Sequence, residues 1–419
     1  MRRYIITAVV LLSTTHLAHA QYSVADYLAD VMDYSHTIAI ARISVKGADA
    51  DLRRARKGYL PSLDMDREMN YNFRRDGNER RLSWAMRADI SQPIFDGGMV
   101  RAEVKRAESR YDVVANREQV SQLNVEYDAV SAYWELSRAN IHQRAMADYC
   151  DIVRSLRDVV ERRFDEGYTA KGDLLQVESR LSDAEYLLSS ADEQRLVALH
   201  NFNVLRGSDP MAEVVLKESI MDSMYMPPRV ALDDILQCHP EYAASINEKE
   251  YARWGVRATW AEFLPSINLG VYGLWQPNTP NVKGAGTRLD GGVVMTFHTP
   301  IFHFGERRQA LRSARSSQRI AELDVEAMAD RISLDESNGW TNLQSARARV
   351  NATRRNLALA KENLDISTYS YREGMATILD VLQAQLSWLQ IYENAIAAHY
   401  DYALAIAAYR RIIADSLWR

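Results

Sequence analysis

Two long stretches of the chain carry the hydrophobic spacing of α-helices and contain no proline. The stretches are 94–209 and 301–419, and glycine is also absent from 99–166. Apolar residues recur at steps of three and four, the spacing of one helical face. The second stretch shows this spacing as a heptad seam at Leu343, Ala346, Val350, Thr353, Leu357, Ala360 and Leu364. A helix of about 68 residues would be about 100 Å long, so the pattern predicts helices that pack lengthwise as coiled coils.

Each long helical stretch is interrupted by a glycine. Gly167 breaks the first stretch and Gly374 breaks the second, and a further helical pattern follows each, over about 171–205 and 377–416. Glycine readily adopts the left-handed conformation that ends helices. We therefore expect a helical hairpin in each half of the chain, with a glycine turn at its tip.

Four shorter segments alternate apolar and polar residues with the period of β-strands. They cover 63–73, 82–91, 267–275 and 289–298, and Asp76-Gly77-Asn78 predicts the turn between the first two. Alternation over about ten residues is typical of outer-membrane strands, and a soluble sheet with one buried face has the same pattern. On the first interpretation, the carboxylates of the polar face are candidates to line a barrel lumen: Asp64, Asp66, Glu68, Asp89 and Asp290.

The chain is internally duplicated. Three landmarks recur in the same order: Leu-Pro-Ser before a strand, Pro-Ile-Phe after the next strand, and Glu-Gly followed by Asp-(Leu/Val)-Leu-Gln at the helical break. The interval is 204 residues for Pro61 and Pro265, and 207 residues for Pro93 and Pro300 and for Gly167 and Gly374. A period this long indicates two subdomains rather than a solenoid.

The duplication gives the predicted domain organisation. We assign 21–209 to the first repeat, 210–232 to a connector and 233–419 to the second repeat. Each repeat is expected to hold a helix, a strand hairpin and a long helical hairpin. The fold class is therefore mainly α, with a small β portion of four strands.

The N-terminus predicts export. Arg2 and Arg3 precede an apolar run at 5–12, and Ala18 and Ala20 fit the small-residue cleavage pattern. We expect a signal peptide at 1–20.

The rest of the sequence limits how the chain could cross a lipid bilayer. Beyond residue 20 there is no run of about 20 apolar residues that would predict a membrane helix, and the mean hydropathy is -0.33. A membrane crossing would then use strands closed into a barrel, because open sheet edges are not tolerated in lipid. Four strands are too few, since about eight are needed. The strand count therefore predicts an oligomer of two or three copies.

Charge and composition narrow the chemistry. The net charge of -5 argues against nucleic-acid binding, which favours a basic surface. Cys150 and Cys238 are expected to be small core residues rather than a disulfide, and the nine histidines show no metal-ligand spacing. No nucleophile–base pair or phosphate loop is present in the sequence. We expect no enzymatic activity and no cofactor.

At the duplicated landmarks the sequence resembles the TolC-like outer membrane efflux protein family, over roughly Tyr22 to Ile413. The resemblance implies a homotrimer with one twelve-stranded barrel in the outer membrane and an α-helical tunnel in the periplasm. It also implies docking to a periplasmic adaptor (membrane fusion) protein and to an inner-membrane pump of the RND (proton-driven) or ABC type.

The resemblance assigns roles at the tips as well. Asp380 matches an acidic position at the periplasmic constriction, where three copies would form a carboxylate ring that favours cations. The alternative is a helix-start carboxylate near the positive end of the helix dipole. Tyr371 matches a position that ties a closed tip, against plain coiled-coil packing, and Asp173 is the first-repeat counterpart of Asp380. Gln383 and Ala376 depart from the family pattern of a second acid and a basic tie.

The tip turns are also the expected adaptor contact, although these residues could simply permit the turn. They are Gly167, Thr169, Ala170, Gly374, Met375, Ala376 and Thr377.

The function expected from these features is a passive outer-membrane exit duct for tripartite efflux of drugs, metals or other small molecules. An exit duct of a type I protein secretion system is the alternative within transport. A non-conducting periplasmic coiled-coil protein is the alternative of another class, and it leaves the two strand hairpins unexplained.

Overall fold

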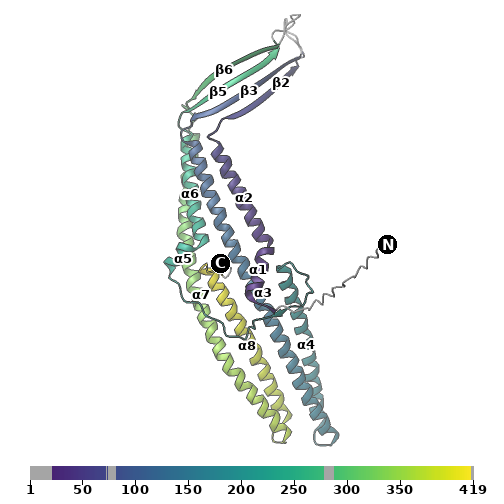
Figure 1. Ribbon diagram of the computed structural model, residues 1–419. Coiled ribbons are helices and arrows are strands. Elements are labelled where there is room, and N and C mark those ends of the chain that lie inside the picture. The colour runs from purple at the N-terminus through teal and green to yellow at the C-terminus, as the bar shows by residue number, and fades with distance from the viewer. Residues whose placement is uncertain (1–20, 72, 74–81, 278–286, 417–419) are drawn as a thin grey trace, which may run out of the picture.

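The computed structural model describes residues 21–71, 73, 82–277 and 287–416. The expected signal peptide and the turn at Asp76-Gly77-Asn78 lie outside the described residues. The molecule is elongated, with a β-sheet at one end and two helical tips at the other (Figure 1). The prediction of a mainly helical chain with four antiparallel strands is confirmed.

Two long helices run along the body of the molecule. They are α3 (Met99–Asp165) and α7 (Glu306–Arg372), each of 67 residues and so about 100 Å long. Each turns back into a shorter helix of 35 residues, α4 (Lys171–Leu205) or α8 (Ile378–Ile412).

The second of these shorter helices ends earlier than the expected 416. Ala414 adopts a left-handed φ of 54°, and the Asp415 N–H donates to the Arg410 carbonyl at 2.9 Å. This bond satisfies a carbonyl that would otherwise be unpaired at the helix end. The helix therefore stops at Ile412.

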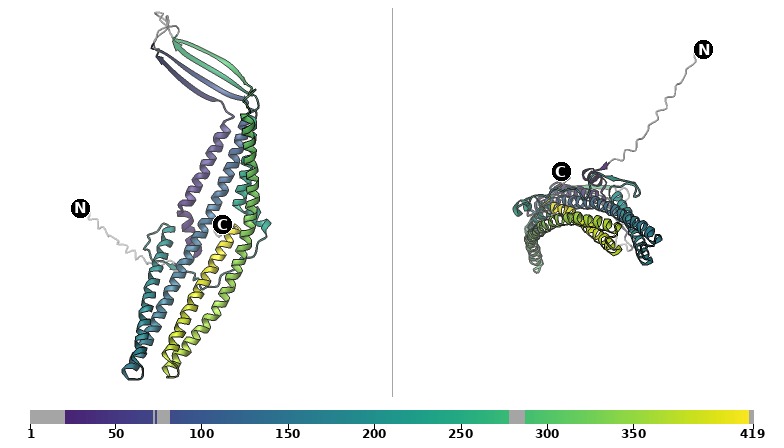
Figure 2. Two further views of the ribbon diagram at one scale, coloured as in Figure 1. Left: turned by 180° about the vertical axis from the view of Figure 1, so that it is seen from behind. Right: turned by 90° about the horizontal axis from the view of Figure 1, so that it is seen from below.

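Shorter helices complete a single curved layer, seen end-on in Figure 2. Beside α3 and α7 near the sheet lie α2 (His36–Lys57) and α6 (Pro240–Ala261), preceded by α1 (Val24–Tyr34) and α5 (Leu232–Cys238). Contacts give the order α2, α3, α6, α7 in the upper half and α4, α3, α8, α7 in the lower half. The equivalent pairs α2 and α6, α3 and α7, and α4 and α8 have equal lengths, whereas α5 is shorter than α1. The boundaries at 209 and 232 stay predictions.

The four long strands form one antiparallel sheet in the order β2, β3, β5, β6, with β2 and β6 at its edges. Their bounds are β2 (Ser62–Tyr71), β3 (Leu82–Phe95), β5 (Ser266–Pro277) and β6 (Thr287–His298). A short parallel pair, β1 (Gln21–Tyr22) and β4 (Val215–Leu216), lies near the middle of the molecule.

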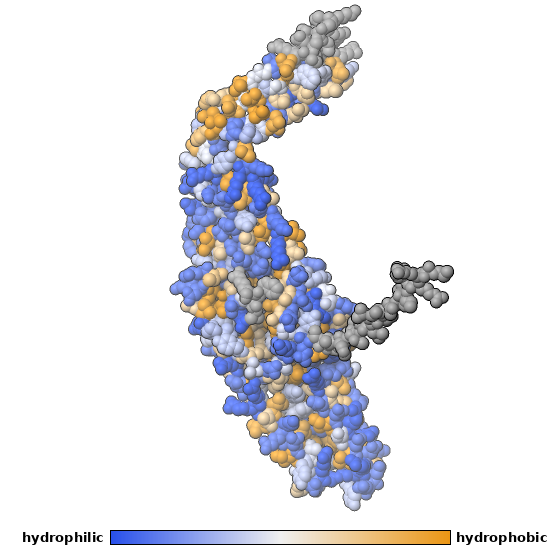
Figure 3. Space-filling model, in the orientation of Figure 1, coloured by the Kyte–Doolittle hydropathy of each residue, from blue (hydrophilic) through white to orange (hydrophobic). Residues whose placement is uncertain are grey.

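The two faces of the sheet differ in chemistry. One ladder row aligns Leu63, Ile90, Val271 and Val293, all with exposed side chains. The apolar surface at the sheet end is visible in Figure 3, where the helical body is mostly polar. The five predicted lumen carboxylates share the opposite face.

The helices bury narrow apolar stripes rather than one central core. One cluster joins α1, α2, α3 and α4, where the rings of Tyr27 and Phe202 stack with centroids 3.8 Å apart. Other clusters follow the helices down to the tips. Among the described helices, none combines the length and apolar character needed to cross a membrane.

Candidate functional site at the helical tips

Both helical hairpins end in the same glycine turn. Gly167 has φ 81° and Gly374 has φ 78°. In the first turn the Tyr168 N–H donates to the Arg163 carbonyl at 2.7 Å and the Gly167 N–H to the Phe164 carbonyl at 3.0 Å. The second turn repeats both bonds. This pair of bonds is the Schellman motif, so the glycine turns predicted from the sequence are confirmed.

The two tips share one apolar core. It takes residues from all four helices of the lower half, so the hairpins are packed against each other rather than separate. The fully buried members are Leu156, Val160, Val177, Tyr371, Ile378, Val381 and Leu382. Tyr371, expected either as a tie or as plain packing, is 4% exposed, and its hydroxyl has no hydrogen-bond partner among the described residues.

Arg163 joins the first tip to the second. Its guanidinium lies over the ring of Tyr371, 4.9 Å from the centroid, and its Nη2 donates to the Arg372 carbonyl at 2.8 Å. A cation over a tyrosine face is attracted by the ring quadrupole, and the hydrogen bond is charge-assisted. Residues from two different hairpins are therefore held together within one turn of each tip.

Asp380 caps the start of α8. The Thr377 backbone N–H and hydroxyl donate to Asp380 Oδ2 at 2.8 and 2.7 Å, and the Asp380 N–H returns a bond to the Thr377 hydroxyl. These bonds form a capping box. The hydrogen bonds from Thr377 hold the pKa of Asp380 below its usual value. The carboxylate is exposed and ionised at neutral pH.

The first tip differs from the second in its cap. Ala170 is the N-cap of α4 and provides no side-chain bond. Asp173 instead accepts a bond from the Thr169 hydroxyl at 2.9 Å. The two acidic positions are therefore equivalent in sequence but have different hydroxyl partners.

A groove between α4 and α8 brings several candidate residues together. It has a volume of about 680 Å³ and runs along the side of the tips. Its polar lining includes Asp380, Gln383, Gln176 and Arg180. Gln176 and Gln383 are duplicate positions, so the groove lies between equivalent turns of the two hairpins. A carboxylate, two amides and a guanidinium can together bind a hydrated cation or a polar solute.

The remaining tip candidates are mostly accessible. Gly167, Gly374, Ala170, Met375 and Thr377 are exposed, and Thr169 and Ala376 are half-buried. The carboxylates predicted to line a lumen lie at the other end of the molecule, so the structure separates the predicted sites into two groups.

A second groove lies over α8 between α3 and α7. It has a volume of about 610 Å³, and Trp388 and Gln385 of α8 lie along it. Gln385 is 1% exposed, and its Oε1 has no hydrogen-bond partner among the described residues. Acidic and basic side chains also line it: Asp148, Asp151, Asp365, Lys361 and Arg372.

Sequence reasoning missed Arg163. The signal that would have identified it is a difference between the repeats, because Ser370 occupies the equivalent position in the second copy. Only the structure places the guanidinium of one hairpin over the aromatic ring of the other.

Comparison with known proteins agrees with this architecture. The family model described as "Outer membrane efflux protein" matches residues 28–208 and 231–414. The chain is similar to the outer membrane efflux protein BepC of Brucella suis biovar 1 (strain 1330), with 26% identity over 99% of this chain and 91% of the relative.

Two further relatives extend the comparison. The crystal structure of CusC superposes with a TM-score of 0.83 at 15% identity, covering 94% of this chain and 92% of that chain. The alkaline protease secretion protein AprF of Pseudomonas aeruginosa (strain PAO1) is 23% identical over 60% of this chain and 53% of its own length.

Proposed function

The chain belongs to the outer membrane efflux protein family, and from this premise we propose that three copies join through their sheet edges into one exit duct. The family is one of non-enzymatic outer membrane efflux channels, so the chain is a channel rather than an enzyme. What we propose is how copies of the chain assemble, what they dock with and where flow is controlled.

The main support for assembly of three copies is the pair of unpaired strand edges in the sheet. Strands β2 and β6 each have one neighbour in the described sheet, so each has a row of backbone groups open for pairing. Lipid tolerates no open edge. Pairing β6 of one copy with β2 of the next removes both edges, and three copies give twelve strands in a closed barrel.

The duplication predicts the register of that pairing. Within the chain, Asp89 of β3 lies opposite Tyr272 of β5. The equivalent residues are Thr296 of β6, 207 positions later, and Glu68 of β2, 204 positions earlier. Thr296 of one copy would therefore face Glu68 of the next.

The chemistry of the two faces is consistent with this register. Thr296 pairs with Asn268 on the polar face, the same face that carries Glu68. The neighbouring predicted pair, Met295 with Met69, lies on the apolar face of both edge strands. A closed barrel would thus keep its apolar side outward to lipid and its carboxylates inward.

The edges of the helical layer support lateral assembly as well. The layer ends in α7 on one side and in α2 and α4 on the other. Both edges expose large apolar side chains that a neighbouring copy would bury. They include Ile320, Leu323, Leu334, Leu359 and Ile366 on α7, and Ile40, Ile43, Tyr186 and Val197 opposite.

A periplasmic adaptor would dock in the groove over α8. The groove offers an indole at Trp388 and an unpaired acceptor at Gln385, with charged residues around them. A helix of an adaptor can lay an apolar face on such a floor and pair its polar residues with the rim. The accessible tip residues Met375 and Thr377 lie at the end of the same helices.

The inner-membrane pump would be of the RND or ABC type, and the cargo drugs, metals or other small molecules. Similarity to AprF, a protein named for alkaline protease secretion, favours a second candidate function: the exit duct of a type I protein secretion system. The gene encoding the partner pump distinguishes the two.

The proposal is tested on protein extracted from outer membranes. We expect a detergent-solubilised particle with the mass of three copies, and discrete conductance steps in planar lipid bilayers. A monomeric protein that forms no conductance would contradict the assembly.

A further inference from the structure

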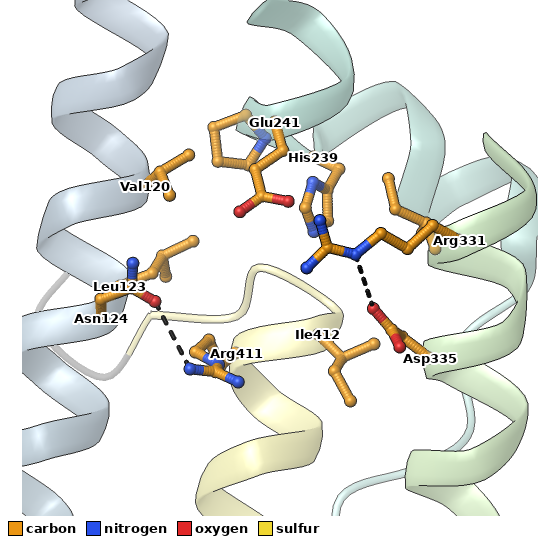
Figure 4. A pocket seen from close by; sticks show the side chains of 11 residues that line it. Val120, Leu123, Asn124, His239, Glu241, Arg331, Asp335, Arg411 and Ile412 are labelled. Atoms are coloured by element: carbon orange, nitrogen blue, oxygen red, sulfur yellow. Dashed lines mark hydrogen bonds and ion pairs between the residues drawn. The ribbon is translucent and has the colours of Figure 1, made fainter. Parts of the chain in front are cut away.

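A polar cavity lies where two helices of the second repeat meet end to end. The C-terminal end of α8 approaches the N-terminal end of α6 between α3 and α7, and the cavity there has a volume of about 250 Å³. Figure 4 shows its lining, with His239, Glu241, Arg331 and Arg411 directed toward one another. The cavity lies in the middle of the chain, away from both the sheet and the tips, and its lining is part polar and part apolar.

The two repeats differ in structure at this junction. At the equivalent junction of the first repeat, the half-exposed ring of Tyr34 packs against Gly207. Gly207 there packs so closely that an added Cβ would lie 2.4 Å from the ring. The equivalent residues in the second repeat are Cys238, which is much smaller than tyrosine, and Ala414, which is one methyl group larger than glycine. The preceding helix is also shorter, at 7 residues in α5 against 11 in α1.

The start of α6 points hydrogen-bond donors at this space. The N-cap is His239, which makes no side-chain cap bond, and Pro240 follows it. The backbone N–H groups of Glu241 and Tyr242 have no carbonyl partner within the helix. In the first repeat the equivalent cap is Ser35, whose hydroxyl accepts from the Ile38 N–H at 3.4 Å.

His239 is an independent sign of a missing ligand. Its side chain lines the cavity, the residue is 8% exposed, and its Nδ1 has no hydrogen-bond partner in the part of the chain that the structure describes. A buried polar atom without a partner costs free energy. Burial lowers the pKa of His239, so the imidazole is neutral at pH 7 and can donate one ring N–H.

Two cations and two carboxylates complete the lining. Arg411 contacts an uncharged oxygen, Asn124 Oδ1, at 3.5 Å, and the Tyr127 ring at 4.7 Å. Arg331 Nε lies 3.7 Å from Asp335 Oδ2, which leaves its terminal nitrogens facing the cavity (Figure 4). Glu241 adds an acceptor beside these donors.

We propose that this cavity binds a protonated phosphate group, as hydrogen phosphate or as the monoanion of a small phosphate monoester, which also carries a P–OH group. Helix N-termini and arginines bind phosphate oxygens, and His239 supplies a further donor. Glu241 would repel a fully ionised anion such as sulfate. It can instead accept a hydrogen bond from the P–OH group of hydrogen phosphate, so that the same site prefers a protic oxyanion.

Calorimetric titration of the detergent-solubilised full chain tests the site. We expect one saturable site per chain for inorganic phosphate at pH 7, and at least about tenfold weaker binding of sulfate at equal ionic strength, which is about 1.4 kcal/mol. Binding of glycerol phosphate with similar affinity would assign the site to monoesters, and binding of inorganic phosphate alone to the free ion. Equal binding of sulfate and phosphate, or none of either, would overturn the proposal.

The decisive variant is His239→Asp. Aspartate is a favoured N-cap, so it supplies an anion to α6 without endangering the fold, and phosphate binding should be lost. Arg411→Gln should weaken binding at least about tenfold, since a charged partner is removed. The matched control is Ser35→Ala at the equivalent cap of α2, which should bind phosphate as the unmodified chain does. Retained binding by His239→Asp would contradict the site.

Discussion

The guanidinium of Arg163 lies 4.9 Å from the ring centroid of Tyr371. Arg163 belongs to the first hairpin and Tyr371 to the second, and the same guanidinium donates to the Arg372 carbonyl at 2.8 Å. This contact ties the two tips of one chain. Any outward movement of α7 and α8 relative to α3 and α4 at the tips has to break it.

Removing this tie should open the tips. Arg163→Ala loses a cation–π contact and a charge-assisted hydrogen bond, together about 1–3 kcal/mol. We expect larger or more frequent conductance steps in planar bilayers, and faster hydrogen exchange at 371–376. Ser370→Ala, at the equivalent position of the second repeat, is the matched control and should leave conductance unchanged. Identical traces for Arg163→Ala and the unmodified channel would show that the contact does not restrain the tips.

Asp380 should control cations at the tips. If three copies form a carboxylate ring, Asp380→Asn should reduce block by multivalent cations, while Asp173→Asn should have a smaller effect. Hydrogen bonds from Thr377 lower the pKa of Asp380 below the usual aspartate value. The carboxylate is therefore ionised at pH 7 and loses its charge only when the pH falls below that usual value. Block should therefore persist down to about pH 4. Unchanged block in Asp380→Asn would leave this residue only its helix-capping role.

Gly207, just after the end of α4, and Gly374, at the tip of the second hairpin, should differ in their tolerance of a methyl group. At Gly207 an added Cβ would lie 2.4 Å from Tyr34, and φ is 72°, whereas at Gly374 nothing lies within 4 Å. Gly207→Ala should destabilise by about 3 kcal/mol, from left-handed strain and overpacking. Gly374→Ala should cost about 1 kcal/mol. Denaturant unfolding in detergent measures both, and equal losses would contradict the close packing at Gly207.

A buried carboxylate fastens the connector to α7. Arg229 Nε and Nη2 donate to the two oxygens of Glu336 at 2.9 and 3.0 Å, and Glu336 is 5% exposed. Arg229→Ala leaves that buried carboxylate without its cation, at a cost of about 1–3 kcal/mol, since Arg229 is half exposed. Arg229→Ala combined with Glu336→Gln should cost less than Arg229→Ala alone.

The stability that the Arg229–Glu336 ion pair contributes should depend on pH in a defined direction. The hydrogen bond from Arg229 lowers the pKa of Glu336 in the folded protein. Its stabilisation is therefore complete above pH 4.5, the usual value, and is lost as the pH falls through the lowered pKa. The stability difference between Arg229→Ala and the unmodified chain should shrink in acid. A difference independent of pH would exclude this ion pair as its source.

The regular parts of the fold were predictable because they depend on local patterns. Freedom from proline and glycine marked α3, and alternation marked the strands. Gly167 and Gly374 predicted the turns because few other residues accept their φ. Contacts between distant segments were not predictable in this way. The sequence carries Thr377 and Asp380 at capping-box spacing, but nothing in the spacing of Arg163 predicts that it meets Tyr371, which lies in another hairpin.

The cavity at His239 was likewise not predictable from local patterns, because segments that are distant in the sequence form it. At this junction Cys238 and Ala414 replace the Tyr34 and Gly207 of the first repeat, and only the structure shows that α8 and α6 meet there end to end. The lumen carboxylates are an intermediate case. Alternation put them on one face, as the sheet register confirms, and their exposure to a lumen stays a prediction.

Cross-linking between edge strands tests the assembly most directly. The duplication predicts Glu68 opposite Thr296 of the next copy, and directly opposed antiparallel residues lie about 4.5–5.5 Å apart at Cα, within the range of a disulfide. In a Cys238→Ser background, Glu68→Cys with Thr296→Cys should give covalent dimers and trimers and nothing larger. Glu68→Cys with Met295→Cys places the thiols on opposite faces and should stay uncoupled. Absence of cross-linked trimers from the first pair, or equal cross-linking of both pairs, would contradict a duct closed by three copies in this register.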